Sequence, residues 1–196
     1  MKQSLLLFCM LCSFGLAAQH ETLFDEFDIV GAFGGPILEI GSINGTVGAN
    51  VGGGGALLIN NFFLGGYGIN ADYPMVRVNG LDYNTRFRQG GFWLGYVHND
   101  YKVLHLYSSV RMGWGRAQLR REGSNDFSDR HFTLTPELGL EVNLTTWFKL
   151  ALTGGYRWVN GIDVLPGLNN ASFSSPVGML TFRFGGFGPS TWNWDD

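Results

Sequence analysis

The sequence predicts an all-β protein, an eight-stranded antiparallel up-and-down transmembrane β-barrel, from three observations. The first is the segment HFTLTPELGLEVNL, residues 131–144, in which apolar and polar residues alternate, so that a strand here has one apolar face and one face that carries Glu137 and Glu141. The second is composition: the 196 residues include 30 glycines, which disfavour helices, and 15% aromatic residues, which favour strands. The third is that short turns alternate with long loops, as in transmembrane barrels.

The N-terminus has the pattern of an export signal. Lys2 supplies a positive charge, residues 5–16 are mostly apolar, and Ala17 and Ala18 form a small-residue cleavage site. The apolar stretch is too short to span a bilayer as a helix, and no longer one follows it. We therefore expect a signal peptide at residues 1–18, a periplasmic lead at 19–28, the transmembrane barrel at 29–187 and a C-terminal tail at 188–196.

Composition and charge argue against several kinds of site. Both cysteines, Cys9 and Cys12, lie in the predicted signal, so the mature chain has no disulfide and no thiolate metal site. The formal net charge of −3 gives no indication of nucleic-acid binding. The histidines are isolated or, for His98 and His105, separated by a turn. We therefore expect no metal, no cofactor and no catalytic residues.

The turn residues divide the chain into eight expected strands. Asn44-Gly45 is a favoured hairpin turn, Gly34-Gly35-Pro36 is expected to bend the first strand, and Pro136, which has no N–H to donate, predicts a local irregularity in the sixth. Three loops are long enough to contact a protein partner, at residues 72–82, 120–130 and 160–172. The strands are expected at residues 29–43, 46–59, 62–71, 83–97, 102–119, 131–144, 148–159 and 174–187.

The alternation assigns the polar strand residues to the barrel interior. In the fourth strand Arg86 and Arg88 share their parity with apolar residues, so we predict a bulge near Gly90-Gly91 that turns both arginines inward. Eight strands leave an interior only wide enough for side chains, which favours a packed ionic plug over a cation-lined path for anions. The expected lumen ionic network is Glu39, Arg86, Arg88, Arg111, Glu137, Glu141, Lys149, Arg157 and Arg183.

The last predicted strand ends in the aromatic-rich run Phe182-Arg183-Phe184-Gly185-Gly186-Phe187. Together with the export signal, the alternating strands and the unequal loops, this run resembles the small eight-stranded outer-membrane barrels, such as the outer membrane protein A barrel domain and the OmpX type. The resemblance implies a place in the outer membrane of a Gram-negative cell, contact with outer-membrane lipids including lipopolysaccharide, and recognition of the last strand by the barrel-assembly machinery.

Four arginines lie near the outer ends of the fifth and sixth predicted strands: Arg116, Arg120, Arg121 and Arg130. Guanidinium groups bind phosphates bidentately, so these side chains are possible lipid-phosphate contacts. The alternative is a solvated loop in which the nearby carboxylates of Glu122, Asp126 and Asp129 neutralise them.

From these observations we expect a non-enzymatic outer-membrane barrel with a plugged polar lumen and a structural or surface-interaction role. One alternative is a small anion-preferring pore, and a second is a soluble lipocalin-like binding barrel, which needs an apolar interior and a polar exterior. A third is a lipid A-modifying barrel enzyme. That enzyme would need His131 to approach Asp129 and a serine, either Ser128 or Ser124.

Overall fold

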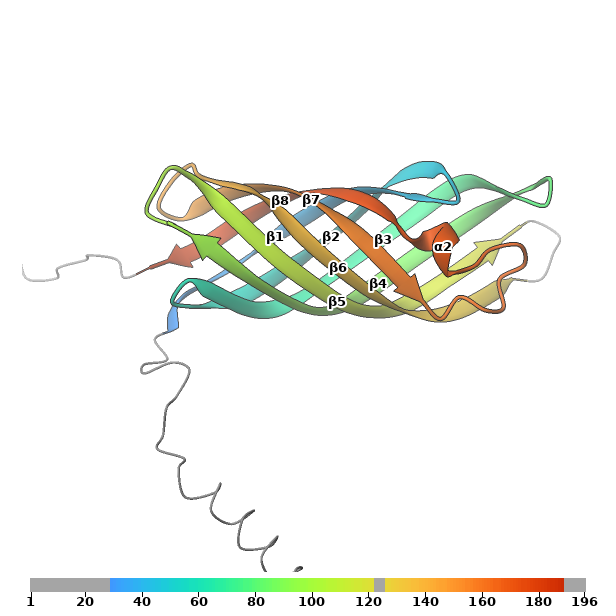
Figure 1. Ribbon diagram of the computed structural model, residues 1–196, viewed down its shortest axis with the longest axis horizontal. Helices are drawn as coiled ribbons and strands as arrows, with labels where there is room; N and C mark the ends of the chain where they lie inside the picture. Colours follow the sequence, from blue (N-terminus) through green and yellow to red (C-terminus); the bar gives the residue numbers. More distant parts are fainter. Residues whose placement is uncertain (1–28, 122–125, 189–196) are drawn as a thin grey trace, which may run out of the picture.

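A computed structural model of the chain describes residues 29–121 and 126–188. Each strand pairs antiparallel with its neighbours in sequence, and β1 pairs with β8, so the sheet closes into a barrel (Figure 1). This confirms the predicted eight-stranded all-β fold. The elements are β1 (Ile29–Ile43), β2 (Thr46–Ile59), β3 (Phe62–Val78), β4 (Leu81–His98), β5 (Leu104–Arg120), β6 (Phe127–Asn143), β7 (Phe148–Asn160), α2 (Asn170–Phe173) and β8 (Ser175–Phe187).

The two ends of the barrel differ in what they carry (Figure 1). At one end, here called the terminal end, β1 begins and β8 finishes; at the other, the loop end, α2 lies beside the mouth. The predicted signal peptide and lead, and residues 189–196 of the predicted tail, lie outside the described residues. Within the described ranges no helix has the length and apolar character needed to cross a membrane.

The segment 72–82 was expected to be a long loop, and that prediction is wrong. β3 continues to Val78 and β4 begins at Leu81, so that Asn79-Gly80 forms a two-residue turn. Both turn residues have positive φ, 51° and 79°, as a type I′ hairpin turn requires. The polar residues of this segment suggested a loop. They lie on the outer face of β3 and β4, which continue past the part of the barrel wall whose outer face is apolar. The inward residues of this extension, among them Tyr73, are buried.

The predicted bulge near Gly90-Gly91 is also wrong. β4 keeps one register with β3 and with β5 through this glycine pair. Phe87 therefore points into the barrel and is buried, while Arg86 and Arg88 point outward. The alternation of inward and outward side chains continues unbroken along β4, but the face that carries the apolar residues changes partway along the strand. Apolar residues face outward in the middle of the wall, whereas they face the core at the loop end.

The irregularity predicted at Pro136 is confirmed, and both proline segments interrupt one ladder without a change of register. Pro136 pairs with Val110 of β5, and on the β7 side the ladder omits Thr135 and Pro136 but resumes at Glu137 without a change of register. The missing N–H of proline accounts for this gap. Gly34-Gly35-Pro36 stays within β1 and in register with β2, while the ladder with β8 omits Gly35 and Pro36 and resumes at Ile37.

Aromatic side chains form two bands on the outer wall. Toward the loop end, the Trp114 ring lies between Phe92 and Phe132, with centroids 6.1 and 5.5 Å away. At the terminal end, the rings of Trp147 and Phe184 stack with centroids 6.1 Å apart. Paired aromatic girdles of this kind mark the two membrane interfaces of transmembrane barrels.

Candidate functional site: the barrel interior and the outer arginines

Charged side chains fill much of the barrel interior. Leaving histidine aside, four acidic and four basic side chains are buried among the described residues. Because charges removed from water must be paired to offset their desolvation, the equal numbers favour a self-neutralising interior. The buried charged residues are Glu39, Asp129, Glu137, Glu141, Arg111, Lys149, Arg157 and Arg183.

The carboxylate of Glu39, on β1, lies at the centre of the first ionic group. Arg157 Nη1 donates to Glu39 Oε1 at 3.0 Å, and Arg111 donates to Oε2. Asn50 Nδ2 also donates to Oε1, and its own amide oxygen accepts from the Tyr73 hydroxyl at 3.1 Å. This one carboxylate thereby connects β1 to β2, β3, β5 and β7.

Arg111 extends the same group to β6. Its Nε donates to Glu137 Oε1 at 2.8 Å, and the Ser109 hydroxyl donates to Glu137 Oε2 at 2.8 Å. Both oxygens of the Glu137 carboxylate therefore have donors, as a buried carboxylate requires. The Tyr67 ring lies 5.0 Å from the Arg111 guanidinium carbon.

A second ionic group, around Glu141, lies nearer the terminal end. Arg183 donates to Glu141 Oε2, while His105 Nε2 and Lys149 Nζ lie 3.1 and 3.6 Å from Oε1. The guanidinium carbon of Arg183 is 3.6 Å from the centroid of the Phe33 ring, a cation–π distance. Three further rings lie within 6 Å of this carbon: Phe63, Tyr107 and Phe187.

The loop end of the interior holds a cluster of buried apolar side chains. The segment between β7 and β8 folds back over the mouth, and four of its residues join a buried cluster with inward residues of the strands. Within this cluster the Phe173 ring stacks on Phe87, with centroids 5.7 Å apart. The four residues are Ile162, Leu165, Leu168 and Phe173.

Asp129, on β6, fixes this segment in place. Its Oδ2 accepts hydrogen bonds from the backbone N–H groups of Asp163, Val164 and Leu165, at 3.0, 2.7 and 3.0 Å. Residues 160–172, predicted as a loop free to contact a partner, are thus partly a lid built into the barrel mouth. Asp129 was expected to neutralise arginines or, in the enzyme alternative, to approach His131, since no sequence pattern pairs it with this distant backbone.

Seven of the nine predicted lumen residues lie inside the barrel, and two do not. The inward placement of Arg86 and Arg88 is wrong: on the outer face, Arg86 Nε donates to Asp72 Oδ1 at 2.7 Å and Arg88 Nε to Asn70 Oδ1 at 3.1 Å. The predicted network also omitted His105. Its parity in β5, the same as that of Arg111, is the signal that identifies it.

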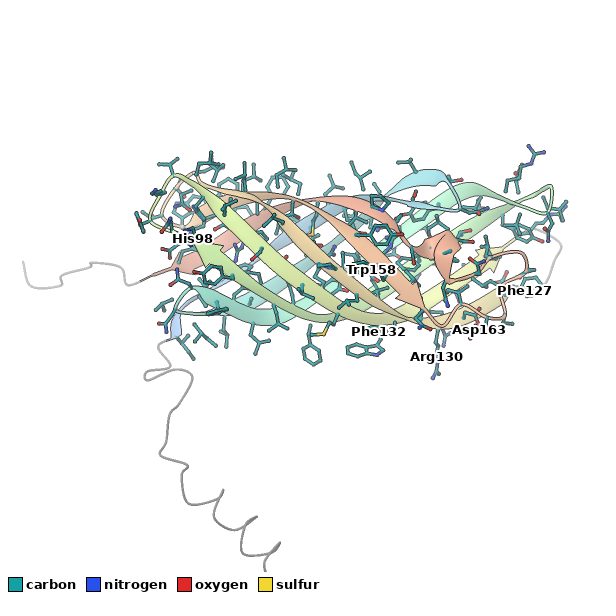
Figure 2. The ribbon with its side chains drawn as sticks, viewed as in Figure 1. His98, Phe127, Arg130, Phe132, Trp158 and Asp163 are labelled. Carbon is teal, nitrogen blue, oxygen red and sulfur yellow. The ribbon has the colours of Figure 1, made fainter. Side chains whose placement is uncertain are left out.

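The outer arginines form a row that the sequence did not reveal. In the strand register Arg88 of β4 pairs with Arg116 of β5, which pairs with Arg130 of β6. All three residues are exposed, and Arg130 projects from the wall beside Phe132 (Figure 2). Of the other candidates, Arg120 lies 3.5 Å from Asp126 Oδ2. Arg121 is exposed and follows the last residue of β5.

No family model and no curated protein matches the chain. Among solved structures, Neisserial surface protein A is similar with a TM-score of 0.60 and 13% identity, over 82% of this chain and 98% of that one. Ail, the attachment invasion locus protein of Yersinia pestis, is similar with a TM-score of 0.50 and 15% identity, over 81% and 99%. The chain has the fold of the small outer-membrane β-barrels.

In this outer-membrane-type barrel, His131 does not meet those of its predicted catalytic partners that belong to the described residues. Its imidazole is buried and stacks on the Phe87 ring, with centroids 4.4 Å apart. Asp129 is occupied by the lid backbone, Ser128 faces outward, and Ser124 lies outside the described residues. Within those residues there is also no group of three or more His, Asp or Glu side chains that could hold a metal ion.

Proposed function

We propose that this chain is a closed, non-enzymatic barrel of the Gram-negative outer membrane, with a structural or surface-interaction role. The polarity of the wall supports the location. Outward side chains such as Leu138 and Leu152 are 62% and 64% exposed, whereas the charged strand residues of the interior are buried. A soluble lipocalin-like barrel has the opposite polarity. The surface location named for Neisserial surface protein A is in keeping with the proposal.

The observation that supports the closed-lumen proposal is that three groups of buried side chains follow one another along the interior. The apolar cluster under the lid lies at the loop end, the Glu39 group lies in the middle, and the Glu141 group with its aromatic rings lies toward the terminal end. An anion-preferring pore would need an excess of unpaired cations along a continuous path. Here each of the four buried basic side chains has a carboxylate within 4.0 Å.

Planar-bilayer recording tests closure directly. Purified protein inserted into a bilayer is expected to give no sustained conductance, with a large porin in the same apparatus as a positive control for recording. Insertion is checked separately by recovering the protein from the membrane in its heat-modifiable form. Sustained, anion-selective steps from the wild-type chain would favour the small-pore alternative and refute closure.

Location and orientation are tested by single cysteines, because the predicted mature chain contains none. Asn79→Cys lies in the turn at the loop end, and Asp100→Cys lies between β4 and β5 at the terminal end. If the loop end faces the medium, a membrane-impermeant maleimide added to intact cells labels the first variant alone. Labelling of both variants in lysed cells shows that both sites react. Recovery of the protein in the detergent-free soluble fraction would instead support the lipocalin-like alternative.

A further inference from the structure

We propose that Arg88, Arg116 and Arg130, the arginine row, bind the phosphates of a lipid headgroup that carries more than one phosphate, as diphosphorylated lipid A does. This inference rests on the proposed outer-membrane location, with the loop end facing outward. It assigns a ligand to the outer wall of the barrel, which the closed-lumen proposal leaves without one.

The strand register brings the three guanidinium groups together. Arg88 and Arg116 are direct cross-strand partners, as are Arg116 and Arg130, and all three point away from the interior. Adjacent strands are spaced by about 4.8 Å, so the three Cα positions span about 10 Å across the wall. A single phosphate engages one or two such groups bidentately, whereas a row of this width accommodates two phosphates.

The row lacks protein counter-charges. Like charges placed directly opposite each other destabilise a sheet. Among the described residues no carboxylate forms an ion pair with Arg88, Arg116 or Arg130, and the one recorded side-chain partner is the neutral amide of Asn70. The next arginines toward the loop end differ. Arg86 is paired with Asp72, and Arg120 lies beside Asp126.

The row also lies where lipid headgroups meet the barrel. Trp114 and Phe132, paired across β5 and β6, belong to the aromatic band near the loop end. Arg116 and Arg130 each lie two residues from these aromatics on the same outer face, one step toward the loop end. Aromatic girdles mark the membrane interface, so the guanidinium groups occupy the phosphate level while the apolar wall below faces acyl chains.

Binding of defined lipids by purified protein in phosphatidylcholine nanodiscs tests the proposal. The probes are diphosphoryl lipid A, monophosphoryl lipid A, phosphatidylglycerol and inorganic phosphate, with bound lipid counted by native mass spectrometry. Replacing all three arginines, R88Q/R116Q/R130Q, keeps most of each side-chain stem but removes three charge-assisted contacts. We expect the affinity for diphosphoryl lipid A to fall about tenfold or more. The monophosphoryl form is expected to bind the wild type more weakly than the diphosphoryl form.

The matched control is R77Q/R86Q/K102Q, which removes the same charge from outward or exposed positions outside the row. Its affinity for diphosphoryl lipid A is expected to stay within about twofold of the wild type, because dispersed surface charges contribute little. Heat-modifiable migration in gels shows that each variant is folded.

Three outcomes would overturn the proposal. The first is unchanged binding by the row variant, and the second is an equal loss in the control, which would indicate net charge alone. The third is displacement of diphosphoryl lipid A by an equal concentration of phosphatidylglycerol or inorganic phosphate. These outcomes are distinct from failure of the proposed function, which conductance and cysteine labelling report. If the protein conducts ions but still binds diphosphoryl lipid A through the row, the closed-lumen proposal is refuted and the lipid-binding proposal stands.

Discussion

Arg157 of β7 donates a hydrogen bond to Glu39 of β1 across the barrel interior, with 3.0 Å between Nη1 and Oε1. The two residues are 118 positions apart in sequence, and both side chains are fully buried. A second guanidinium, that of Arg111, lies against the same carboxylate. The charge of Glu39 thus compensates two buried cations at once, and the stability of the barrel is expected to depend on it.

Replacing Glu39 by Gln tests this dependence. The amide leaves two buried guanidinium groups without their shared charge, so we expect the free energy of unfolding to fall by about 3–5 kcal/mol. Urea titration in detergent micelles, followed by tryptophan fluorescence, measures the change. The control is Asp72→Asn, which removes the exposed pair with Arg86 and is expected to leave stability nearly unchanged. Equal losses in the two variants would contradict the prediction.

Asp129→Ala is expected to release the lid over the barrel mouth. The substitution removes the acceptor of three backbone N–H groups and leaves them to find other partners. We predict faster protease cleavage within residues 161–169, measured by mass spectrometry of the fragments, while the strands stay resistant. Ser128→Ala, on the outward face of the same strand, provides the control. A lid that is equally resistant in both variants would show that Asp129 does not hold it.

Two glycines of the wall are expected to respond oppositely to alanine. A Cβ at Gly95 would lie 2.1 Å from the Phe63 ring, so Gly95→Ala is expected to lower the free energy of unfolding by about 1–3 kcal/mol. A Cβ at Gly68 meets nothing within 4 Å, so Gly68→Ala is expected to be neutral or stabilising by up to about 1 kcal/mol. Urea titrations of both variants give the comparison, and a reversed order would be inconsistent with the packing around Phe63.

Arg183→Lys is expected to lower the free energy of unfolding although it conserves the charge. The planar guanidinium of Arg183 lies over the Phe33 ring while donating to Glu141, and an ammonium group lacks a plane to stack. We expect a loss of about 2 kcal/mol, typical of a desolvated cation–π contact. Thermal or urea unfolding measures it against Arg77→Lys, an exposed position. A loss no larger than that of the control would argue that Arg183 acts as a charge alone.

The sequence predicted the wall of the barrel well because strand alternation is a local property. The bounds of β1 and β2 are those expected, and in β6 the parity of residues 131–144 correctly separates outward Leu138 from inward Glu137. The same reasoning misplaced Arg86 and Arg88. It assumed that polar residues always point inward, which holds only where the outer face meets lipid. In the proposed membrane placement the outer face beyond the aromatic band meets water, and the assignment reverses.

By itself, then, the sequence determined the strand number, the alternation and most of the residues that line the interior, since each follows from neighbours a few positions apart. Only the tertiary structure decided which charges meet. The pairing of Arg157 with Glu39, the capture of the lid by Asp129 and the alignment of Arg88, Arg116 and Arg130 all depend on closure and register. A shift of one residue in register would move every side chain of a strand to the opposite face. Register is set by the turns together with closure of the whole sheet, and the alternation of residues within one strand does not encode it.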